Sequence, residues 1–453
     1  MLMTFLGFLP EINPSVLMSA IADESNDITL SVSGGSSVGS IDQIFASQGI
    51  KIDTNSMYYD AVDVQRILLA QIETPDVFVL DADDGYWGLV QKGYLEEITD
   101  HEILREISSY YPFIQLVLKD SRQRVVSIPE YFYATHWCVN ETLWMEILGD
   151  TPYPSTYLEL AKLYKQWRTD FAEEHSSVKL LEFSGDSCAF ILSVIKQYLA
   201  ECQISGSTIE FDHPMFIDTL ETLRELDLKA ISIDDEDIYF NQHSLLIMRP
   251  FGGFGVEYLD GFKYVPISPP CVTQEGQPYI PARMRVMLIN PFSPHKDAAY
   301  QYMKAYMNAY SSAFKASIIS SWNTPVYSAQ AKREIQQIQE TIELKTQLLQ
   351  KAQEEWDVDT EDKITFELLS LREKLDTVAQ EGYEVSEEDI LAYQSIAPYI
   401  NLLFGSPYAS DDDPAMQSIS RVVKQFVDQK ITSKECALAL NEITRMVSLE
   451  NGV

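Results

Sequence analysis

The fold of this chain is most constrained by residues 75–80, PDVFVL, which end in a continuous run of β-forming apolar residues. Such a run, without the alternation of a half-exposed strand, is typical of a strand buried on both faces of a parallel sheet. Further strands are predicted at 28–33 and 51–59, and the apolar spacing over 61–72 predicts a helix. Strands that alternate with helices in this way indicate a doubly wound α/β unit.

The later part of the chain is richer in helices. Helices are predicted at 155–168, 210–226 and 296–310, and strands at 244–249 and 285–290.

Residues 330–381 differ in composition from the rest of the chain, being rich in Gln, Glu, Lys and Leu. Apolar residues recur there with 3–4 spacing in two stretches, with Lys345 in one seam position, and DVDTED (357–362) separates the stretches. This pattern predicts an antiparallel helical hairpin. Capping boxes that begin at Ser386 and Thr432 predict further helices, so the last third is expected to be helical.

Composition limits the possible functions. The chain has 453 residues, enough for two or three domain-sized units, and 46% of them are apolar. The formal net charge of −35 would repel phosphate backbones and anionic lipids, which argues against nucleic-acid binding. The five cysteines show no C-x-x-C pair and the six histidines no H-x-x-x-H pair. The sequence therefore predicts neither a metal site nor a cofactor.

Residues 1–26 are expected to form an N-terminal tail. The stretch is apolar, but it lacks a basic region and is interrupted by Pro10, Glu11 and Pro14. It fits neither a signal peptide nor a membrane span, and no later stretch reaches about 18 apolar residues. Any export signal is expected to lie upstream of this sequence or to have been removed.

Residues 81–88, DADDGYWG, follow the central strand and place carboxylates beside aromatic side chains. The segment does not match a calcium-binding loop that begins at Asp81, because Lys92 occupies the position of the last acidic ligand of such a loop. The Asp-x-Asp pattern also resembles the nucleophile motif of haloacid-dehalogenase-type hydrolases, with Asp81 as nucleophile and Asp83 as acid/base. Against this, Gly85 stands where that family has Thr or Val, and two strand–helix units precede the motif.

Other candidate binding residues lie in loops after predicted strands. Gly35–Gly39 matches G-x-S-x-G, but no oxyanion loop precedes it, so a turn that leads into a helix N-terminus is favoured. Backbone N–H groups beside Ser36 and Ser37 could hold a polar ligand there. Aromatic residues cluster beside glycines and prolines in PEYFYATHW, RPFGGFG and SSWNTPVY, as in clefts for flat or sugar-like ligands. Arg249 could hold a carboxylate or hydroxyl groups, or form a surface ion pair.

Taken in order, several segments resemble one family. They are the helix, P-D-V, strand and aromatic loop of 61–99, VVSIPEYFYATHWCVNETLW (125–144), YPSTYLELAKLYKQW (153–167), RVMLINPFSPHKDAAYQYMKAYMN (285–308) and WNTPV (322–326). This order is similar to that of the extracellular solute-binding proteins of ABC importers, in the large family that includes maltodextrin-binding proteins. The long hairpin resembles an elaboration of some Gram-positive members.

The resemblance implies a two-lobed α/β fold of the periplasmic-binding-protein type II, with a helical C-terminal region and a helical-hairpin insertion. Residues 27–134 and 280–322 would form lobe 1, and residues 135–279 and 323–453 lobe 2. Segments near 133–138, 268–282 and 322–327 would form the hinge.

The same resemblance implies capture of a small polar solute, a carbohydrate being favoured, and its delivery to an ABC permease by a monomer anchored at the cell surface as a lipoprotein. Hinge closure and no enzymatic reaction are expected. The residues expected to contact the ligand are Ser36, Ser37, Asp83, Asp84, Tyr86, Trp87, Tyr133, Trp137, Arg249, Phe251 and Trp322.

Two alternatives stay open at this point. One is a magnesium-dependent phosphohydrolase that uses Asp81 and Asp83. The other is an interaction protein whose partner surface is the hairpin at 330–381.

Overall fold

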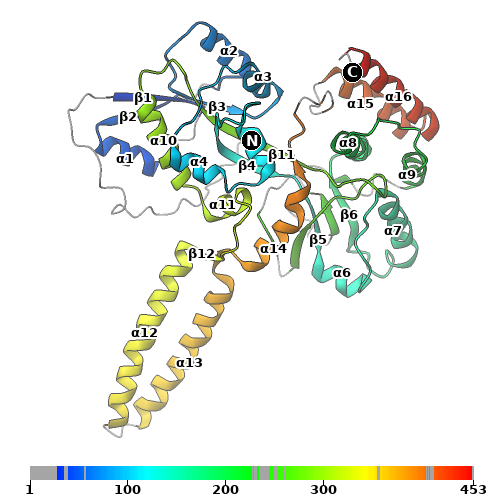
Figure 1. Ribbon diagram of the computed structural model, residues 1–453. Helices are drawn as coiled ribbons and strands as arrows, with labels where there is room; N and C mark the ends of the chain where they lie inside the picture. Colours follow the sequence, from blue (N-terminus) through cyan, green and yellow to red (C-terminus); the bar gives the residue numbers. More distant parts are fainter. Residues whose placement is uncertain are drawn as a thin grey trace.

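The computed structural model describes residues 28–34, 39–55, 58–226, 228, 232–233, 244–248, 254–259, 262–354, 358–404, 406, 408 and 413–450. Two α/β lobes lie side by side, and a helical hairpin projects away from them (Figure 1). Within these ranges, no helix combines the length and the apolarity needed to cross a membrane.

The first lobe is built on a mixed sheet. Its strands are β1 (Ile28–Ser33), β2 (Ile50–Asn55), β3 (Val77–Asp81), β4 (Ile128–Ala134), β11 (Ile280–Ile289) and β14 (Ile400–Asn401). The order is β14-β11-β3-β1-β2, with β4 also paired to β11. Strand β1 is parallel to β2 and β3, as the alternation of strands and helices predicts, whereas β11 is antiparallel to β3 and β4.

Helices cover this sheet on its faces. They are α1 (Gly39–Ser47), α2 (Ala61–Leu69), α3 (Asp84–Lys92), α4 (His101–Ile107), α5 (Pro112–Leu118), α10 (Lys296–Asn308) and α11 (Ser312–Ile318). The strand predicted to reach residue 59 ends at Asn55, and the helix predicted to reach residue 72 ends at Leu69.

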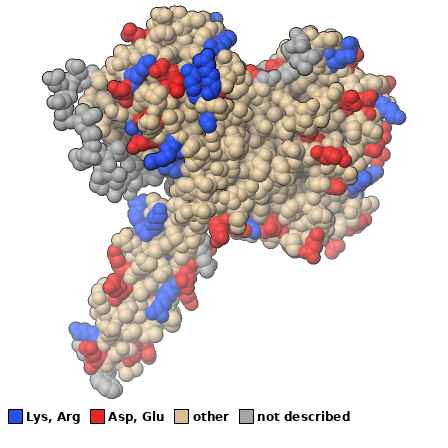
Figure 2. Space-filling view, in the orientation of Figure 1, with Lys and Arg blue, Asp and Glu red and all other residues tan. Residues whose placement is uncertain are grey.

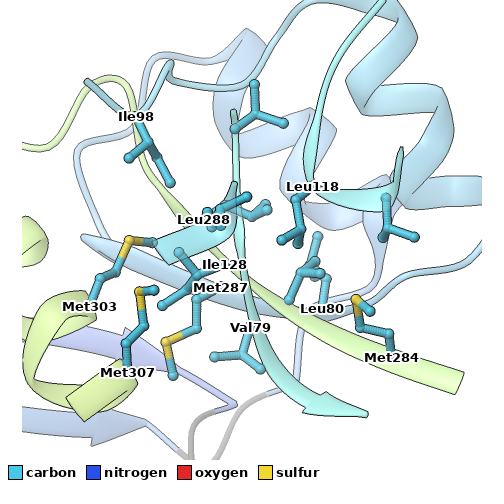
Figure 3. Close-up of a cluster of buried hydrophobic side chains, with 14 of the residues drawn as sticks. Val79, Leu80, Ile98, Leu118, Ile128, Met284, Met287, Leu288, Met303 and Met307 are labelled. Carbon is cyan, nitrogen blue, oxygen red and sulfur yellow. The ribbon is translucent and has the colours of Figure 1, made fainter. Parts of the chain in front are cut away.

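Strand β3 is central to the core of this lobe. Residues 77–80 are all buried, as their unbroken apolar run predicts. Figure 3 shows Val79 and Leu80 among Met284, Met287 and Leu288 of the neighbouring strand. Full burial of each such side chain contributes roughly 1.5–3 kcal/mol. Just before the strand, buried Asp76 accepts hydrogen bonds from Ser31 N (2.7 Å) and Ser293 Oγ (2.6 Å), which fixes where β3 begins.

The second lobe has its own sheet and core. Its strands are β5 (Trp137–Asn140), β6 (Lys179–Ser184), β7 (Ser232–Ile233), β8 (Ser244–Met248), β9 (Glu257–Leu259) and β10 (Phe262–Ile267), in the order β7-β6-β8-β5-β10-β9. Its helices are α6 (Glu141–Leu148), α7 (Tyr157–Asp170), α8 (Ser187–Ser205), α9 (Pro214–Arg224), α15 (Pro414–Val427) and α16 (Ser433–Glu450). The capping box of α7 uses Thr156 with Glu159, so the helix begins at Tyr157 and not at residue 155 as predicted.

The hairpin predicted over 330–381 is confirmed. It consists of α12 (Ala329–Glu354) and α13 (Val358–Glu381), and its root is closed by β12 (Val326–Tyr327) paired with β13 (Tyr383–Val385). Ile338, Ala352, Ile364 and Leu368 are buried along the seam between the helices. Lys345, the polar residue in that seam, lies 2.5 Å from the carboxylate of Glu367. Figure 2 shows side chains of both charges over the outer surface of the hairpin.

The segment after the hairpin returns to the first lobe before it enters the second. Helix α14 (Glu387–Ile396) places Tyr393 and Ile396 in the first core, and β14 then pairs with β11. The sequence analysis assigns all of 323–453 to lobe 2, but in the structure Tyr393, Ile396 and Ile400 belong to the first core, whereas Tyr408 and the helices from residue 414 onward pack on the second. The pairing of β14 with β11 joins residues 120 positions apart, such as Ile280 and Ile400, and no local pattern signals it.

A candidate ligand-binding cleft between the two lobes

A cavity of about 850 Å³ opens where the chain crosses between the lobes. This volume lies within the range of roughly 300–1,000 Å³ that small-molecule sites occupy. Its walls come from the β4–β5 crossing, helix α8, the start of β11 and the segment after β14. The residues that line it include Tyr133, Thr135, Trp137, Tyr157, Phe183, Ser193, Lys196, Gln197, Gln203, Tyr279, Arg283, Leu402, Leu403, Ser406 and Tyr408.

Two crossing segments form one wall of the cleft because they are paired with each other. Tyr133 on β4 stands opposite Arg283 on β11 in the antiparallel register, so the two side chains share a face of the sheet. The backbone N–H of Thr135 donates to the carbonyl of Pro281 over 2.8 Å, which extends the pairing beyond the strand. Two residues later Trp137 begins β5 and the chain enters the second lobe.

Helix α8 holds the segment that leads into β11 in place. The side chain of Gln197 accepts from Tyr279 N (3.3 Å) and donates to Gln277 O (3.3 Å). One turn later, the Glu201 carboxylate accepts from the backbone N–H groups of Val272 (2.7 Å) and Thr273 (3.2 Å). Burial raises the pKa of Glu201, against the opposing effect of these hydrogen bonds. The network positions Tyr279 at the edge of the cleft.

The cleft is aromatic and hydroxyl-rich. Tyr133, Trp137, Tyr157, Tyr279 and Tyr408 all line it. Burial raises the pKa of Tyr157 and of Tyr279, so both hydroxyls stay neutral and can donate hydrogen bonds. Aromatic faces with a few fixed polar groups suit a flat, hydroxylated ligand. Among the described residues, no group of His, Cys, Asp and Glu side chains could hold a metal ion.

A second cavity of about 240 Å³ adjoins the cleft. Both cavities are lined by Gln203, Leu402 and Leu403. At the far side, the ring of Trp87 stacks on that of Phe404, with 5.2 Å between ring centroids and 9° between planes. The cleft therefore extends toward the N-terminal part of α3.

The structure brings together three of the predicted ligand residues. Tyr133 and Trp137 line the cleft, and Trp87 lines the adjoining cavity. Trp322 lies elsewhere, packed against the small cluster of Ala316, Val385 and Ile390. The predicted residues Ser36, Ser37, Arg249 and Phe251 lie outside the described residues.

Asp83, Asp84 and Tyr86 of the DADDGYW segment do not line the cleft, although the sequence analysis expects them to contact the ligand. Asp83 is the N-cap of α3, and its carboxylate accepts from Tyr86 N over 2.8 Å, while Asp84 is an exposed residue in the first turn. Tyr86 is fully buried, and its hydroxyl lies 2.8 Å from both Val117 O and Ser127 Oγ. Because the helix begins at Asp84, its 3.6-residue period turns Tyr86 into the core, and a ligand in the cleft cannot reach it.

The same geometry removes the support for a phosphohydrolase. Asp81 ends the third strand of the chain, in register with Arg285 of β11, and the carboxylate of Asp83 is already used as a helix cap. An Asp-x-Asp pair that shares a substrate requires both carboxylates to be available.

Sequence reasoning did not find several residues of the cleft. They are Tyr157, Phe183, Lys196, Gln197, Gln203, Tyr279, Arg283, Leu402 and Leu403. One signal was present in α8, which is apolar on most sides yet carries Lys196 and Gln197 in its middle. A polar pair within such a helix indicates a polar cavity or a buried hydrogen-bond network.

Comparison with known proteins supports the fold. No family model and no curated protein sequence matches this chain. The solved structure of maltose-bound MalE3 from T. maritima aligns with 92% of this chain and 100% of its own, with a TM-score of 0.50 and 14% identity. An ABC substrate-binding protein from Listeria monocytogenes in complex with cycloalternan covers 93% of this chain and 98% of its own, with a TM-score of 0.46 and 13% identity. The predicted fold class is confirmed: the chain has the two-lobed α/β fold seen in MalE3, and it includes the helical hairpin of α12 and α13.

Proposed function

We propose that this protein binds a carbohydrate between its two lobes, as the solute-binding component of an ABC importer, and catalyses no reaction. The observation that carries the proposal is the aromatic, hydroxyl-rich cleft of about 850 Å³ at the crossing of the lobes. The structural neighbour with the same fold is described as maltose-bound. Tyrosine and tryptophan rings stack on the apolar faces of sugar rings, while hydroxyl and amide groups bind sugar hydroxyls.

Closure of the lobes would follow from the position of the cleft. A ligand that touches α8 on one side and the β4–β11 wall on the other makes its full set of contacts only when the lobes approach each other. Such contacts shift the population toward the closed form by their differential binding free energy. The closed form would be the one that a permease recognises at the outer face of the membrane, and the protein would act there as an anchored monomer.

A thermal-shift screen tests the proposal. Maltotriose, trigalacturonate, glucose 6-phosphate, amino acids and short peptides are each added to the full chain. We expect at least one sugar to raise the melting temperature, because a ligand at 100 times its Kd stabilises the folded state by about 2.7 kcal/mol.

Two tyrosines on β4 provide a matched pair of variants. Tyr133 lines the cleft, whereas Tyr131, two residues away and exposed, is absent from its lining. We expect Tyr133→Ala to abolish most of the ligand-induced shift and Tyr131→Ala to leave it nearly unchanged. Equal effects of the two substitutions, or no shift with any sugar, would count against a sugar site in this cleft.

A further inference from the structure

The charges that line the cleft have the opposite sign to the charge of the whole protein. The chain has 68 acidic and 33 basic residues. Yet among the described residues that line the cleft there is no Asp or Glu, and there are two cations, Lys196 and Arg283. Acidic side chains are twice as frequent as basic ones in the whole chain. The excess of basic side chains in the cleft therefore indicates the charge of the ligand.

Two arginines on β11, Arg283 and Arg285, have different environments. That of Arg283 is typical of a ligand-binding residue. Arg285 lies two residues further along β11, where its Nε is 2.8 Å from Glu130 Oε2 and its guanidinium lies 5.6 Å from the ring centroid of Tyr131. Arg283 is exposed in the cleft, opposite Tyr133, and has no carboxylate partner among the described residues. An arginine held on a strand without a counter-ion is available to an anionic ligand.

The second cation approaches from the other lobe. Lys196 is half-buried in the middle of α8, next to Gln197, and it lines the same cleft. The strand β11 that carries Arg283 belongs to the first sheet, and α8 packs in the second core. An anionic group between the two side chains would therefore attract both lobes toward the ligand.

We infer that the ligand is an acidic carbohydrate, whose carboxylate, phosphate or sulfate group binds Arg283. This inference rests on the proposed function. A guanidinium binds carboxylate or phosphate oxygens through two parallel hydrogen bonds between opposite charges, whereas the hydroxyl groups of a neutral sugar offer uncharged and weaker acceptors. The net charge of −35 repels anions only at long range, because salt screens exposed charges beyond about 8 Å at physiological ionic strength. Within the cleft, Arg283 and Lys196 are the charged residues among the described lining residues.

The experiment is a calorimetric titration of the full chain with trigalacturonate, glucose 6-phosphate and maltotriose, at low and at high NaCl. We expect at least one of the two anionic sugars to bind about tenfold or more tightly than maltotriose, with an affinity that falls as salt rises. Trigalacturonate and glucose 6-phosphate distinguish a carboxylate from a phosphate as the recognised group.

Two arginine variants make the test specific. Arg283→Gln should weaken binding of the preferred anionic sugar about tenfold and that of maltotriose by less than about threefold. Arg66→Gln removes the same charge from an exposed site on α2, where Arg66 pairs with Asp63, and should change neither affinity. Arg283→Lys keeps the charge but loses the two-pronged geometry, so an intermediate affinity is expected.

The outcomes separate this inference from the proposed function. If maltotriose binds as tightly as the anionic sugars, and Arg283→Gln weakens all three equally, the acidic-ligand inference is wrong and the sugar-binding function stands. If none of the three sugars binds, both are wrong.

Discussion

At the scale of single residues, Asp83 determines where α3 begins. Its side chain accepts a hydrogen bond from Tyr86 N, which satisfies one of the free N–H groups of the first turn. We predict that Asp83→Ala lowers the free energy of unfolding by about 1 kcal/mol, whereas Asp83→Asn keeps the cap and most of the stability. Urea denaturation of both variants measures this.

The same pair of variants distinguishes a cap from a ligand contact. Sugar affinity should be nearly the same in both variants and in the parent protein. A loss of sugar affinity in Asp83→Asn without a loss of stability would show that this carboxylate binds the ligand.

His136 provides a pH-dependent prediction. It is buried beside Trp137 on the crossing segment, and desolvation lowers its pKa from 6.5 to about 4. The folded state therefore prefers the neutral imidazole, so the stability is fully present above pH 6.5 and is lost as the pH falls toward 4, because the unfolded chain takes up the proton first. From the size of this shift, His136 contributes about 3 kcal/mol of the stability lost over this window.

Urea denaturation at pH 7, 5.5 and 4.5 measures the effect. In His136→Gln the loss of stability between pH 7 and 4.5 should be smaller than in the parent protein, since the other titrating groups are common to both. Parallel pH profiles for the two proteins would mean that His136 does not titrate differently on folding.

Single residues were the hardest part to predict from the sequence. Asp81 and Asp83 share a spacing with catalytic pairs, and only the start of α3 shows that Asp83 is a cap. Tyr133 and Trp137, predicted as aromatic residues beside a strand end, line the cleft, and their contact with a ligand stays a prediction. Arg283 was not predicted, because its position in the cleft without a carboxylate partner among the described residues is seen only in three dimensions.

At the scale of elements, the hairpin is a self-contained unit. Val326 pairs with Val385 at its root, the ring of Tyr327 stacks on that of Tyr383 at 4.2 Å, and Ser328 N donates to Gly382 O over 3.0 Å. The two ends of the insertion are therefore adjacent. We predict that replacing residues 329–381 by a two-residue Asn-Gly turn leaves both lobes folded and the affinity for the preferred sugar within about twofold.

Calorimetric titration and circular dichroism of this deletion variant check the prediction. If the deletion variant still binds the sugar, the hairpin is not needed for ligand binding in the cleft. A deletion variant that folds but no longer binds the sugar would show that ligand binding depends on the hairpin, which contradicts the prediction.

The helices and strands that were predicted correctly are those with the strongest local pattern of apolar residues. The hairpin helices have long 3–4 periodicity, and β3 has an unbroken apolar run, so both were found. The pairing of β14 with β11 was missed, because it depends on a contact between residues 120 positions apart, such as Ile280 and Ile400. The start of α7 was predicted too early, because Glu159 completes a capping box with Thr156, which makes Thr156 the N-cap.

At the scale of the whole molecule, α14 contacts both lobes on a different side from the cleft. Glu388 on α14 lies 2.5 Å from Lys263 of the second lobe, and the carboxylate of Asp389 accepts from Val256 N over 2.7 Å. At the other end, the Tyr393 hydroxyl donates to Ser317 O in the first lobe over 2.9 Å. In Figure 1, α14 lies below the crossing strands, next to the hairpin root, while α8 lies above them.

This position predicts that α14 opposes closure, because a rotation that narrows the cleft separates contacts on the other side of the hinge. Lys263→Met should therefore give a smaller radius of gyration than the parent protein in small-angle X-ray scattering without any ligand. Lys165→Met removes an ion pair with Glu225 inside the second lobe and serves as the control. A radius unchanged in Lys263→Met, or decreased equally in both variants, would contradict a role for α14 in keeping the lobes apart.

The two-lobed arrangement itself could be predicted from the order of the segments, because that order extends over most of the chain. The interior of the cleft could not, since it combines side chains from β4, α8, β11 and the segment after β14. The net charge of −35 describes the outer surface and gives no hint of the cations within. The composition of a site assembled from distant segments becomes visible only when those segments are placed together.

The central claim is that a sugar binds where the two lobes meet, and hydrogen–deuterium exchange tests it most directly. Exchange is measured on the full chain with and without a saturating concentration of the sugar that stabilises it most. We predict slower exchange in 133–137, 192–203, 279–283 and 401–404, which come from both lobes and the crossings, and no change in the hairpin. Slower exchange confined to one lobe, or at the hairpin alone, would contradict the claim.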